Sequence, residues 1–435
     1  MSNIVLNLQK QLSEMSKRIF IIVLFSLLCS KEGFAQKTIT LQECIALATE
    51  NYPSVVRYNL IEKVKDFNIS NIEKSWLPKA SIILKGTYQS DVTEIPISFP
   101  GISIDPLSKT QYSAAIAVNQ TIWDGGVTGT SKKEAQAKAI SDVKELEVEL
   151  YTIKDRVSNI YFGALLIDQY LKETEVLGRE LERMQTKVFV LIASGVADSS
   201  DLYSIQAQTI TLSQRTKELQ NNKESYLKML SLMTGRACDS TVTLLIPAIT
   251  KPTSQDILRP ELSFFDSKKE VVQIQSLYIN NRVMPKIGAF IQAGYGIPGL
   301  NMLKNEASGY YIGGLSLTWS LDGFYTRKND LQKIVTTSAL IESQKETFLY
   351  NARLQNTSIT KEIETIEELS LSDQQLVEIR AKIVASSEVK LENGTTSVTE
   401  HLKEINMLDV ARLALGKRKI ELLKAMSDLK NNLNQ

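Results

Sequence analysis

One long heptad pattern constrains the fold of this chain more than any other feature of its sequence. Between residues 139 and 171 the apolar residues recur at alternating steps of four and three, which is the spacing of a coiled-coil helix. They are Ala139, Val143, Leu146, Leu150, Ile153, Val157, Ile160, Ala164, Ile167 and Leu171. We therefore predict one helix from about residue 132 to residue 192, and about sixty residues at 1.5 Å each give a length of roughly 90 Å.

A shorter helix is predicted to return along this long one. Gly195 is expected to end the long helix, and Asp198 or Ser199 to cap the return helix, which runs from about residue 200 to residue 232. An earlier helix over residues 40–75 would match the remaining length if it were stacked on the return helix. The same elements recur over residues 261–283, 327–391 and 398–432. The sequence thus predicts a mainly helical chain with two long coiled-coil hairpins.

Four short segments have strand periodicity instead, because apolar residues alternate with small or polar ones. In residues 112–122, one face carries Tyr112, Ala114, Ile116 and Val118, and the other carries Ser113, Ala115, Ala117 and Asn119. The other three segments are residues 80–89, 287–296 and 311–320, in which Ile83 and Phe290 break the pattern. Segments of about ten residues with one apolar face are what a transmembrane β-barrel requires. A soluble antiparallel sheet with one wet face is the alternative.

Aromatic residues lie at both ends of these segments. The tyrosines are next to the two long loops, and the tryptophans are next to the helices. Such aromatic girdles are expected where a barrel crosses the two interfaces of a membrane. The predicted interface residues are Tyr88, Tyr112, Tyr295 and Tyr311 on the loop side, and Trp123 and Trp319 on the helix side.

Four strands cannot close into a barrel by themselves. In hydrocarbon, an open sheet edge would leave backbone N–H and C=O groups unpaired, at a cost of several kcal/mol each. If the strands span a membrane, several chains must share one barrel. Three chains would supply twelve strands, enough for an aqueous lumen.

The chain also repeats itself at a spacing of roughly two hundred residues, which is the signature of an internal duplication. Residues 76–89 resemble 283–296, residues 118–126 resemble 317–324, and residues 194–205 resemble 393–405. We therefore divide the chain into a first repeat over 36–250 and a second over 251–435. Both repeats have the order helix, two strands, long helix, return helix.

The N-terminus has the pattern of a secretory signal peptide over residues 1–35. Lys17 and Arg18 precede an apolar run from Ile19 to Leu28, and small residues before and at Ala35 suit a signal peptidase. Later residues contain no apolar run of ~18 residues, so no membrane-spanning helix is expected. The formal net charge of +1 argues against nucleic acid as a partner. Two cysteines remain, Cys44 and Cys238, which either pair or stay as separate buried thiols.

Taken in order, these features resemble the TolC family of outer-membrane efflux proteins over the whole mature chain. The resemblance is carried by residues 40–55 (TLQECIALATENYPSV), the Pro-Lys pairs at 78–79 and 285–286, Trp123-Asp124-Gly125, the segment 259–262 (RPEL) and the two glycine-centred turns. It implies a homotrimer with a twelve-stranded barrel in outer-membrane lipid and a periplasmic α-barrel. It also implies a periplasmic adaptor (membrane fusion) protein and an inner-membrane transporter of the RND or ABC class, which open a passive duct for efflux or type I export.

The resemblance also assigns the candidate site residues. The first tip turn (residues 193–201, with Gly195 and Asp198) and the second tip turn (residues 393–400, with Gly394 and Thr395) would dock the adaptor. Glu400 and Lys403 match the positions that line the periplasmic aperture in the family, where two acidic residues are common. They are either a charged ring or only a helical surface pair. His401, the single histidine, is expected to be a solvent-facing tip residue.

No catalytic or cofactor-binding pattern is found, so no enzyme, metal site or cofactor is expected. A single histidine excludes a multi-histidine metal site. Residues 124–133 (DGGVTGTSKK) lack the ending of a phosphate-binding loop and are interpreted as a strand-to-helix joint. The alternative to a channel is an exported coiled-coil scaffold or adhesin.

Overall fold

The computed structural model describes residues 38–93, 106–239, 241–252 and 254–434, so the predicted signal peptide lies outside the described residues. The described chain divides into two compact units, each built from separate stretches of sequence. The sheet unit contains residues 53–152, 252–359 and 429–434, and the hairpin unit contains residues 38–52, 153–251 and 360–428. Each unit draws on both halves of the sequence, and the repeat boundaries at 36–250 and 251–435 stay a prediction.

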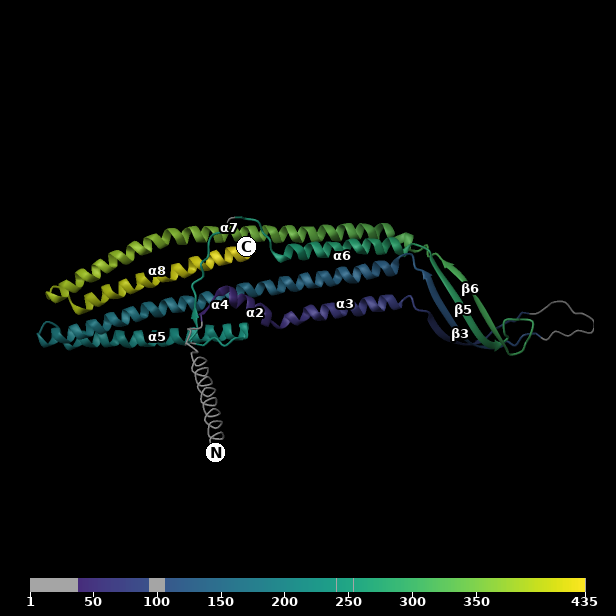
Figure 1. The fold of residues 1–435 in the computed structure, drawn as a ribbon, viewed down its shortest axis with the longest axis horizontal. Helices are drawn as coiled ribbons and strands as arrows, with labels where there is room; N and C mark the ends of the chain where they lie inside the picture. Colours follow the sequence, from purple (N-terminus) through teal and green to yellow (C-terminus); the bar gives the residue numbers. More distant parts are fainter. Residues whose placement is uncertain (1–37, 94–105, 240, 253, 435) are drawn as a thin grey trace, which may run out of the picture. The chain divides into compact units, whose positions relative to one another are not determined.

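The sheet unit carries a four-stranded antiparallel sheet at one of its ends (Figure 1). Its strands pair in the order β2-β3-β5-β6. The bounds are β2 (Lys79–Tyr88), β3 (Thr110–Trp123), β5 (Lys286–Ile297) and β6 (Ser308–Thr318). All four predicted strands are therefore confirmed as strands of one sheet.

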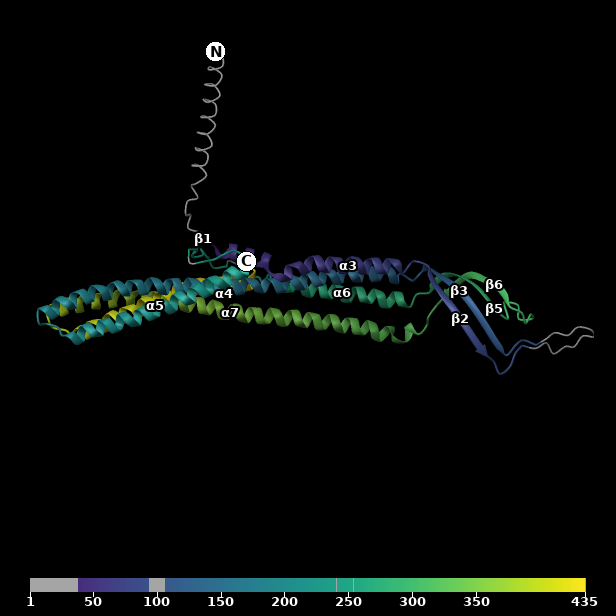
Figure 2. The ribbon, with the colours of Figure 1, turned by 90° about the horizontal axis from the view of Figure 1, so that it is seen from below.

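The helices of this unit are α3 (Arg57–Lys74), α6 (Pro260–Arg282) and the first parts of α4 (Val127–Ala193) and α7 (Gly323–Glu392) (Figure 2). They pack in the same order as the strands to which they are joined. Lys132 of α4 bonds to Glu73 of α3 at 2.9 Å. Glu134 of α4 accepts a hydrogen bond from Gln275 of α6 at 3.1 Å. A 3.0 Å ion pair between Lys269 and Glu342 joins α6 to α7. Consequently α3 and β2 lie at one edge of the unit, and α7 and β6 lie at the other.

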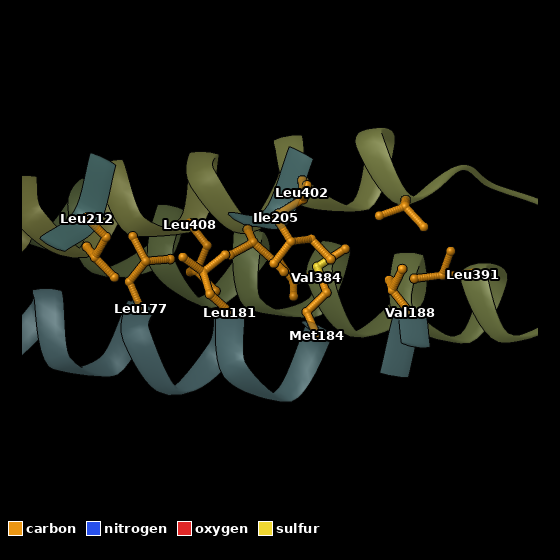
Figure 3. Packing of buried hydrophobic residues seen from close by; sticks show 12 residues of the cluster. Leu177, Leu181, Met184, Val188, Ile205, Leu212, Val384, Leu391, Leu402 and Leu408 are labelled. Carbon is orange, nitrogen blue, oxygen red and sulfur yellow. The ribbon is translucent and has the colours of Figure 1, made fainter. Parts of the chain in front are cut away.

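The hairpin unit contains α2 (Leu41–Asn51), α5 (Ser199–Thr234), most of α8 (Val398–Leu433) and the remaining parts of α4 and α7. A short parallel pair, β1 (Thr38–Ile39) with β4 (Thr243–Leu244), lies beside them. A cluster of buried apolar side chains from α4, α5, α7 and α8 holds the two hairpins together (Figure 3). Its members include Leu177, Leu181, Met184, Val188, Ile205, Leu212, Val384, Leu391, Leu402 and Leu408.

The heptad prediction for the long helix is confirmed, since α4 is continuous from Val127 to Ala193. None of its ten heptad residues is exposed, and Leu146 and Val157 are fully buried. Their burial in both units shows that one helix face is covered along much of its length. The second long helix, α7, is likewise continuous.

The first predicted helix differs from the sequence analysis, because it is split in two. It begins at a capping box, in which the Thr40 hydroxyl accepts from the Glu43 amide and the Glu43 carboxylate accepts from the Thr40 amide. It ends at Asn51, and Tyr52 is extended because the residue before a proline avoids the helical region. A short 3-10 turn at Pro53–Val56 then leads into α3. The Asn51 amide also donates to the Met233 carbonyl at 3.1 Å, near the last turn of α5.

Candidate channel wall and helical tips

The sheet has one apolar and one polar face because its register keeps the alternation of all four strands in step. On the apolar face, one row of paired residues is Ile82, Ile116, Ala293 and Tyr311. On the polar face, the adjacent row is Ser81, Ala117, Gln292 and Ile312. Within a single chain the apolar face is uncovered, and Ile82, Leu84 and Leu315 are each more than three-quarters exposed. A continuous exposed apolar face of this kind requires either an apolar partner surface or an apolar solvent.

The four predicted interface tyrosines all lie on this apolar face, near the ends of the strands that lead to the loops. Tyr88 is the last residue of β2, and Tyr112 pairs with Gly86. Tyr295 pairs with Ala114, and Tyr311 pairs with Ala293. All four rings are exposed, with exposed fractions between 60% for Tyr295 and 80% for Tyr88. The structure therefore brings these tyrosines onto one face of the sheet, one in each of four successive apolar rows toward its loop-side end, as a girdle at an interface would need.

The two predicted interface tryptophans lie at the opposite, helix-side end of the sheet. By simple alternation Trp123 would fall on the polar face, but a β-bulge between Thr121 and Trp123 pairs it with Ile287 of the apolar face. Trp319 follows β6, and its indole N–H donates to the Val283 carbonyl at 3.0 Å. Both rings are exposed in part. Sequence alternation did not predict the bulge.

The joint between β3 and α4 is a helix cap rather than a phosphate loop. The Asp124 carboxylate accepts hydrogen bonds from the amides of Gly126 and Thr128, at 2.9 Å and 2.6 Å. Gly125 has a φ of 73° and leaves no room for a side chain, since an added Cβ would lie 2.7 Å from the Cβ of Met284. The sequence interpretation of this segment as a strand-to-helix joint is confirmed.

The sheet is open at both edges. In the described part of the chain, β2 pairs only with β3, and β6 pairs only with β5. Their outer N–H and C=O groups have no partner strand in this chain. The helices at the same edges also expose apolar side chains, which on α3 are Leu60, Val64 and Phe67. Both edges of the sheet unit are therefore suited to contact with another chain.

The two tip turns have the same backbone motif. In the first, the Val196 amide donates to the Leu191 carbonyl at 2.9 Å, and the Gly195 amide donates to Ile192 at 3.0 Å. In the second, Thr395 donates to Lys390 and Gly394 to Leu391 at the same two distances. This is the Schellman motif, and both glycines have the left-handed φ that it needs, 71° and 65°. A Cβ on Gly394 would lie 3.8 Å from Val196, so the two turns are neighbours within the hairpin unit.

The residues after these glycines start the return helices. Of the two predicted caps, Asp198 or Ser199, the structure has Asp198, which caps α5 in a capping box with Asp201. At the corresponding point the Ser397 hydroxyl accepts from the Glu400 amide at 3.1 Å, and Glu400 lies in the first turn of α8. Glu400 and Lys403 are both exposed, and among the described residues no ion pair joins them. The structure places the predicted aperture residues on the surface of α8, where their charges are free to face other groups.

The prediction for His401 is wrong, because this residue is buried with an exposed fraction of 3%. Its Nδ1 forms a hydrogen bond with the hydroxyl of Ser387, which connects α8 to α7. Burial lowers the pKa of His401 below its ordinary value, although the Glu388 carboxylate opposes this shift. The spacing of Val398, His401, Ile405 and Leu408 would have placed the histidine on the apolar face of α8.

Cys44 and Cys238 are both free and buried, which is the second of the two alternatives left open by the sequence. Burial, together with the neighbouring Cys238 thiol, raises the pKa of Cys44 to about 12. The Cys44 thiol is therefore protonated at neutral pH and is not a nucleophile.

Arg259 is a structural residue whose partners the sequence analysis missed. Its guanidinium lies over the rings of Tyr151 and Phe348, at 5.2 Å and 5.3 Å from their centroids. It also pairs with Glu261 and donates to the Asn432 side chain at 3.0 Å. One residue thus ties the start of α6 to the end of α8, to α4 and to α7. These partners are far from Arg259 in sequence. The sequence therefore shows the order Arg-Pro-Glu but does not predict which distant residues the arginine contacts.

Comparison with solved structures identifies the fold. The outer-membrane channel OprN superposes with a TM-score of 0.67 at 13% sequence identity, covering 90% of this chain and 89% of OprN. The outer membrane protein VceC of Vibrio cholerae gives a TM-score of 0.64 at 12% identity, covering 90% and 95% of the two chains. The CmeC outer membrane channel of Campylobacter jejuni gives 0.61 at 14% identity, covering 90% and 85%. The chain therefore has the fold of outer-membrane channel proteins. Within that class it is the TolC-type fold, which confirms the resemblance found in the sequence at the level of fold.

Sequence comparisons add little to this likeness. No known family model matches the chain. Among curated proteins, the septation ring formation regulator EzrA of Lactiplantibacillus plantarum is 27% identical over 139 residues, which are 31% of this chain. The match spans about a quarter of that relative's length, 24%, and shows no shared family. Among the described residues no helix is both long and apolar enough to cross a membrane.

Proposed function

We propose that this protein is an outer-membrane channel, a passive exit duct formed by three identical chains. The observation that carries the proposal is the sheet, which has an exposed apolar face rimmed by tyrosines and tryptophans and has two open edges. A sheet of this kind satisfies its backbone in lipid only when its edges are closed. The likeness in fold to known outer-membrane channels supports the same function.

Closure by copies of the same chain follows from the strand directions. Because each neighbouring pair in β2-β3-β5-β6 is antiparallel, β2 and β6 run in opposite directions. The β6 strand of one chain would therefore add antiparallel to β2 of the next chain. Three chains would close a barrel of twelve strands, which is wide enough for an aqueous lumen. The helices would extend the duct into the periplasm.

The proposed partners engage the helical end. A periplasmic adaptor protein would dock on the two tip turns, around Gly195, Asp198, Gly394 and Thr395. An inner-membrane transporter of the RND or ABC class would supply the energy, because the duct itself contains no energy source. Glu400 and Lys403, both exposed in the first turns of α8, would face the aperture. The complete assembly would serve tripartite efflux or type I export.

The test is the conductance of the purified mature protein in a planar lipid bilayer. A channel should fractionate with the outer membrane, need detergent for extraction and give discrete current steps. The alternative, an exported coiled-coil scaffold or adhesin, should stay soluble after cell breakage and give no current. A detergent-free soluble monomer without conductance would overturn the proposal.

A further inference from the structure

The charged residues within the four strands are all of one sign. The strands contain Lys79, Lys85 and Lys286 and no aspartate or glutamate. The pairing register places all three lysines on the polar face of the sheet. Lys79 pairs with Asn119, Lys85 with Ser113, and Lys286 with Thr318, whereas their neighbours Ala80, Leu84 and Ile287 belong to the apolar face. The charged residues on the polar face are therefore all cationic.

Among the described residues, no carboxylate is paired with these lysines. In the described part of the chain none of the three forms an ion pair, and all three are exposed. Across from Lys85 the paired residues are small, Ser113 and then Gly296, which leaves its ammonium group open to water. Beyond the helix-side ends of the strands, Asp124 is occupied by the amides at the start of α4. The described loop residues at the other end carry both signs, with Asp91 and Glu306 against Lys109 and Lys304.

We propose that the barrel lumen selects anions, so that the duct favours small anionic solutes as cargo. This inference rests on the proposed channel function, since only in a closed barrel does the polar face become a lumen. Three copies would place a ring of Lys85 side chains inside the barrel and rings of Lys79 and Lys286 toward its helix-side end. Rings of like charge in a narrow aqueous pore concentrate the opposite ion and set selectivity. The preference should strengthen at low salt, because screening over about 8 Å at physiological ionic strength weakens it.

The aperture does not oppose this selectivity. Glu400 and Lys403 lie close together on α8 and carry opposite charges, so their fields largely cancel at a distance. Among the charged residues of the four strands and of the aperture, the aperture pair offset each other. The lysines of the barrel therefore form the only charged rings in this set without an opposite charge beside them.

The experiment measures the reversal potential of the purified channel in a planar bilayer under a KCl gradient. We expect the wild-type potential to have the sign of chloride permeation, and Lys85→Glu together with Lys79→Glu and Lys286→Glu to reverse that sign. Lys85→Gln should reduce the potential without reversing it, and Lys85→Arg should retain the wild-type sign. Lys228→Glu is the control for a single lysine-to-glutamate change outside the sheet, because Lys228 forms an exposed pair with Glu224 on α5.

The outcomes separate the two proposals. Absence of any current would overturn the channel function and, with it, this inference. A conducting channel that prefers potassium would overturn the inference alone, and if Glu400→Gln then removed that preference, the aperture would be the selective element. The inference would also be overturned if no substitution of the three lysines changed the reversal potential. Assembly of each variant is verified by its mass in detergent, so a misfolded variant is recognised before its current is interpreted.

Discussion

At the scale of single residues, the most informative is His401, because burial changes its chemistry. It bonds to Ser387 of α7, and the charged groups that influence its pKa are Glu388 of α7 and Lys187, Arg183 and Glu180 of α4. Lys187 bonds to Glu388 at 3.0 Å, so the carboxylate that most favours the charged form of the histidine is already paired. Burial lowers the histidine pKa in the folded state, and an unfolded or opened tip therefore binds the proton more tightly.

This difference predicts that acid loosens the tip of the α7–α8 hairpin. Above the unfolded-state pKa of about 6.5, His401 makes its full contribution to the free energy of unfolding. That contribution falls as the pH drops below this value, by at most about 1.4 kcal/mol per pH unit. Because the intrinsic rate of hydrogen exchange itself falls with pH, the quantity to compare is the protection factor, and the protection factors of residues 384–405 should therefore fall between pH 7.5 and pH 5.5 in the wild-type protein. His401→Gln cannot titrate and should show a flat profile over the same range. Equal acid sensitivity in both proteins would assign the effect to other groups.

At the scale of elements, periodicity predicted the long helices and the four strands well, because heptads and alternation are local patterns. The predicted start of the first helix near Thr40 is confirmed, whereas its break at Pro53 comes from the proline and interrupts the predicted helix over residues 40–75. The bulge that turns Trp123 to the apolar face depends on pairing with β5, about 165 residues away, so no local pattern encodes it. For the same reason the partners of Arg259 could not be read from the sequence.

The tip turns give a prediction that separates backbone shape from side-chain bulk. Nothing lies within 4 Å of a Cβ on Gly195, and the nearest atom to one on Gly394 is at 3.8 Å, so both sites have room. Valine should nevertheless disturb each turn, since a left-handed residue other than glycine or asparagine costs roughly 1–2 kcal/mol. We expect Gly195→Val and Gly394→Val to reduce chemical crosslinking of the tip to the periplasmic adaptor and to lower efflux. Gly195→Asn and Gly394→Asn are the matched controls, because asparagine tolerates this conformation. Crosslinking unaffected by valine would remove the turns from the docking surface.

At the scale of the whole molecule, the edges of the sheet unit specify how chains would assemble. On one edge, α3 exposes Leu60, Val64 and Phe67 at successive steps of four and three, the spacing of one helix face. On the other edge, α7 exposes Leu340, Tyr350 and Leu354. Because α3 precedes β2 and α7 follows β6, the contact that joins β6 to β2 of the next chain would also bring these helices together.

An acidic residue on the α3 face should therefore prevent assembly without unfolding the chain. Phe67 is 68% exposed, so Phe67→Asp removes few contacts within the chain but would bury a carboxylate at the interface, where an unpaired charge costs several kcal/mol. We expect the mass of the wild-type protein in detergent to be that of three chains and the variant to shift toward one. Asn59→Asp adds the same charge to an exposed position of α3 away from this face and should leave the mass unchanged. The shared barrel would be contradicted if the wild-type protein had the mass of one chain. It would also be contradicted if the Phe67→Asp variant still had the mass of three chains.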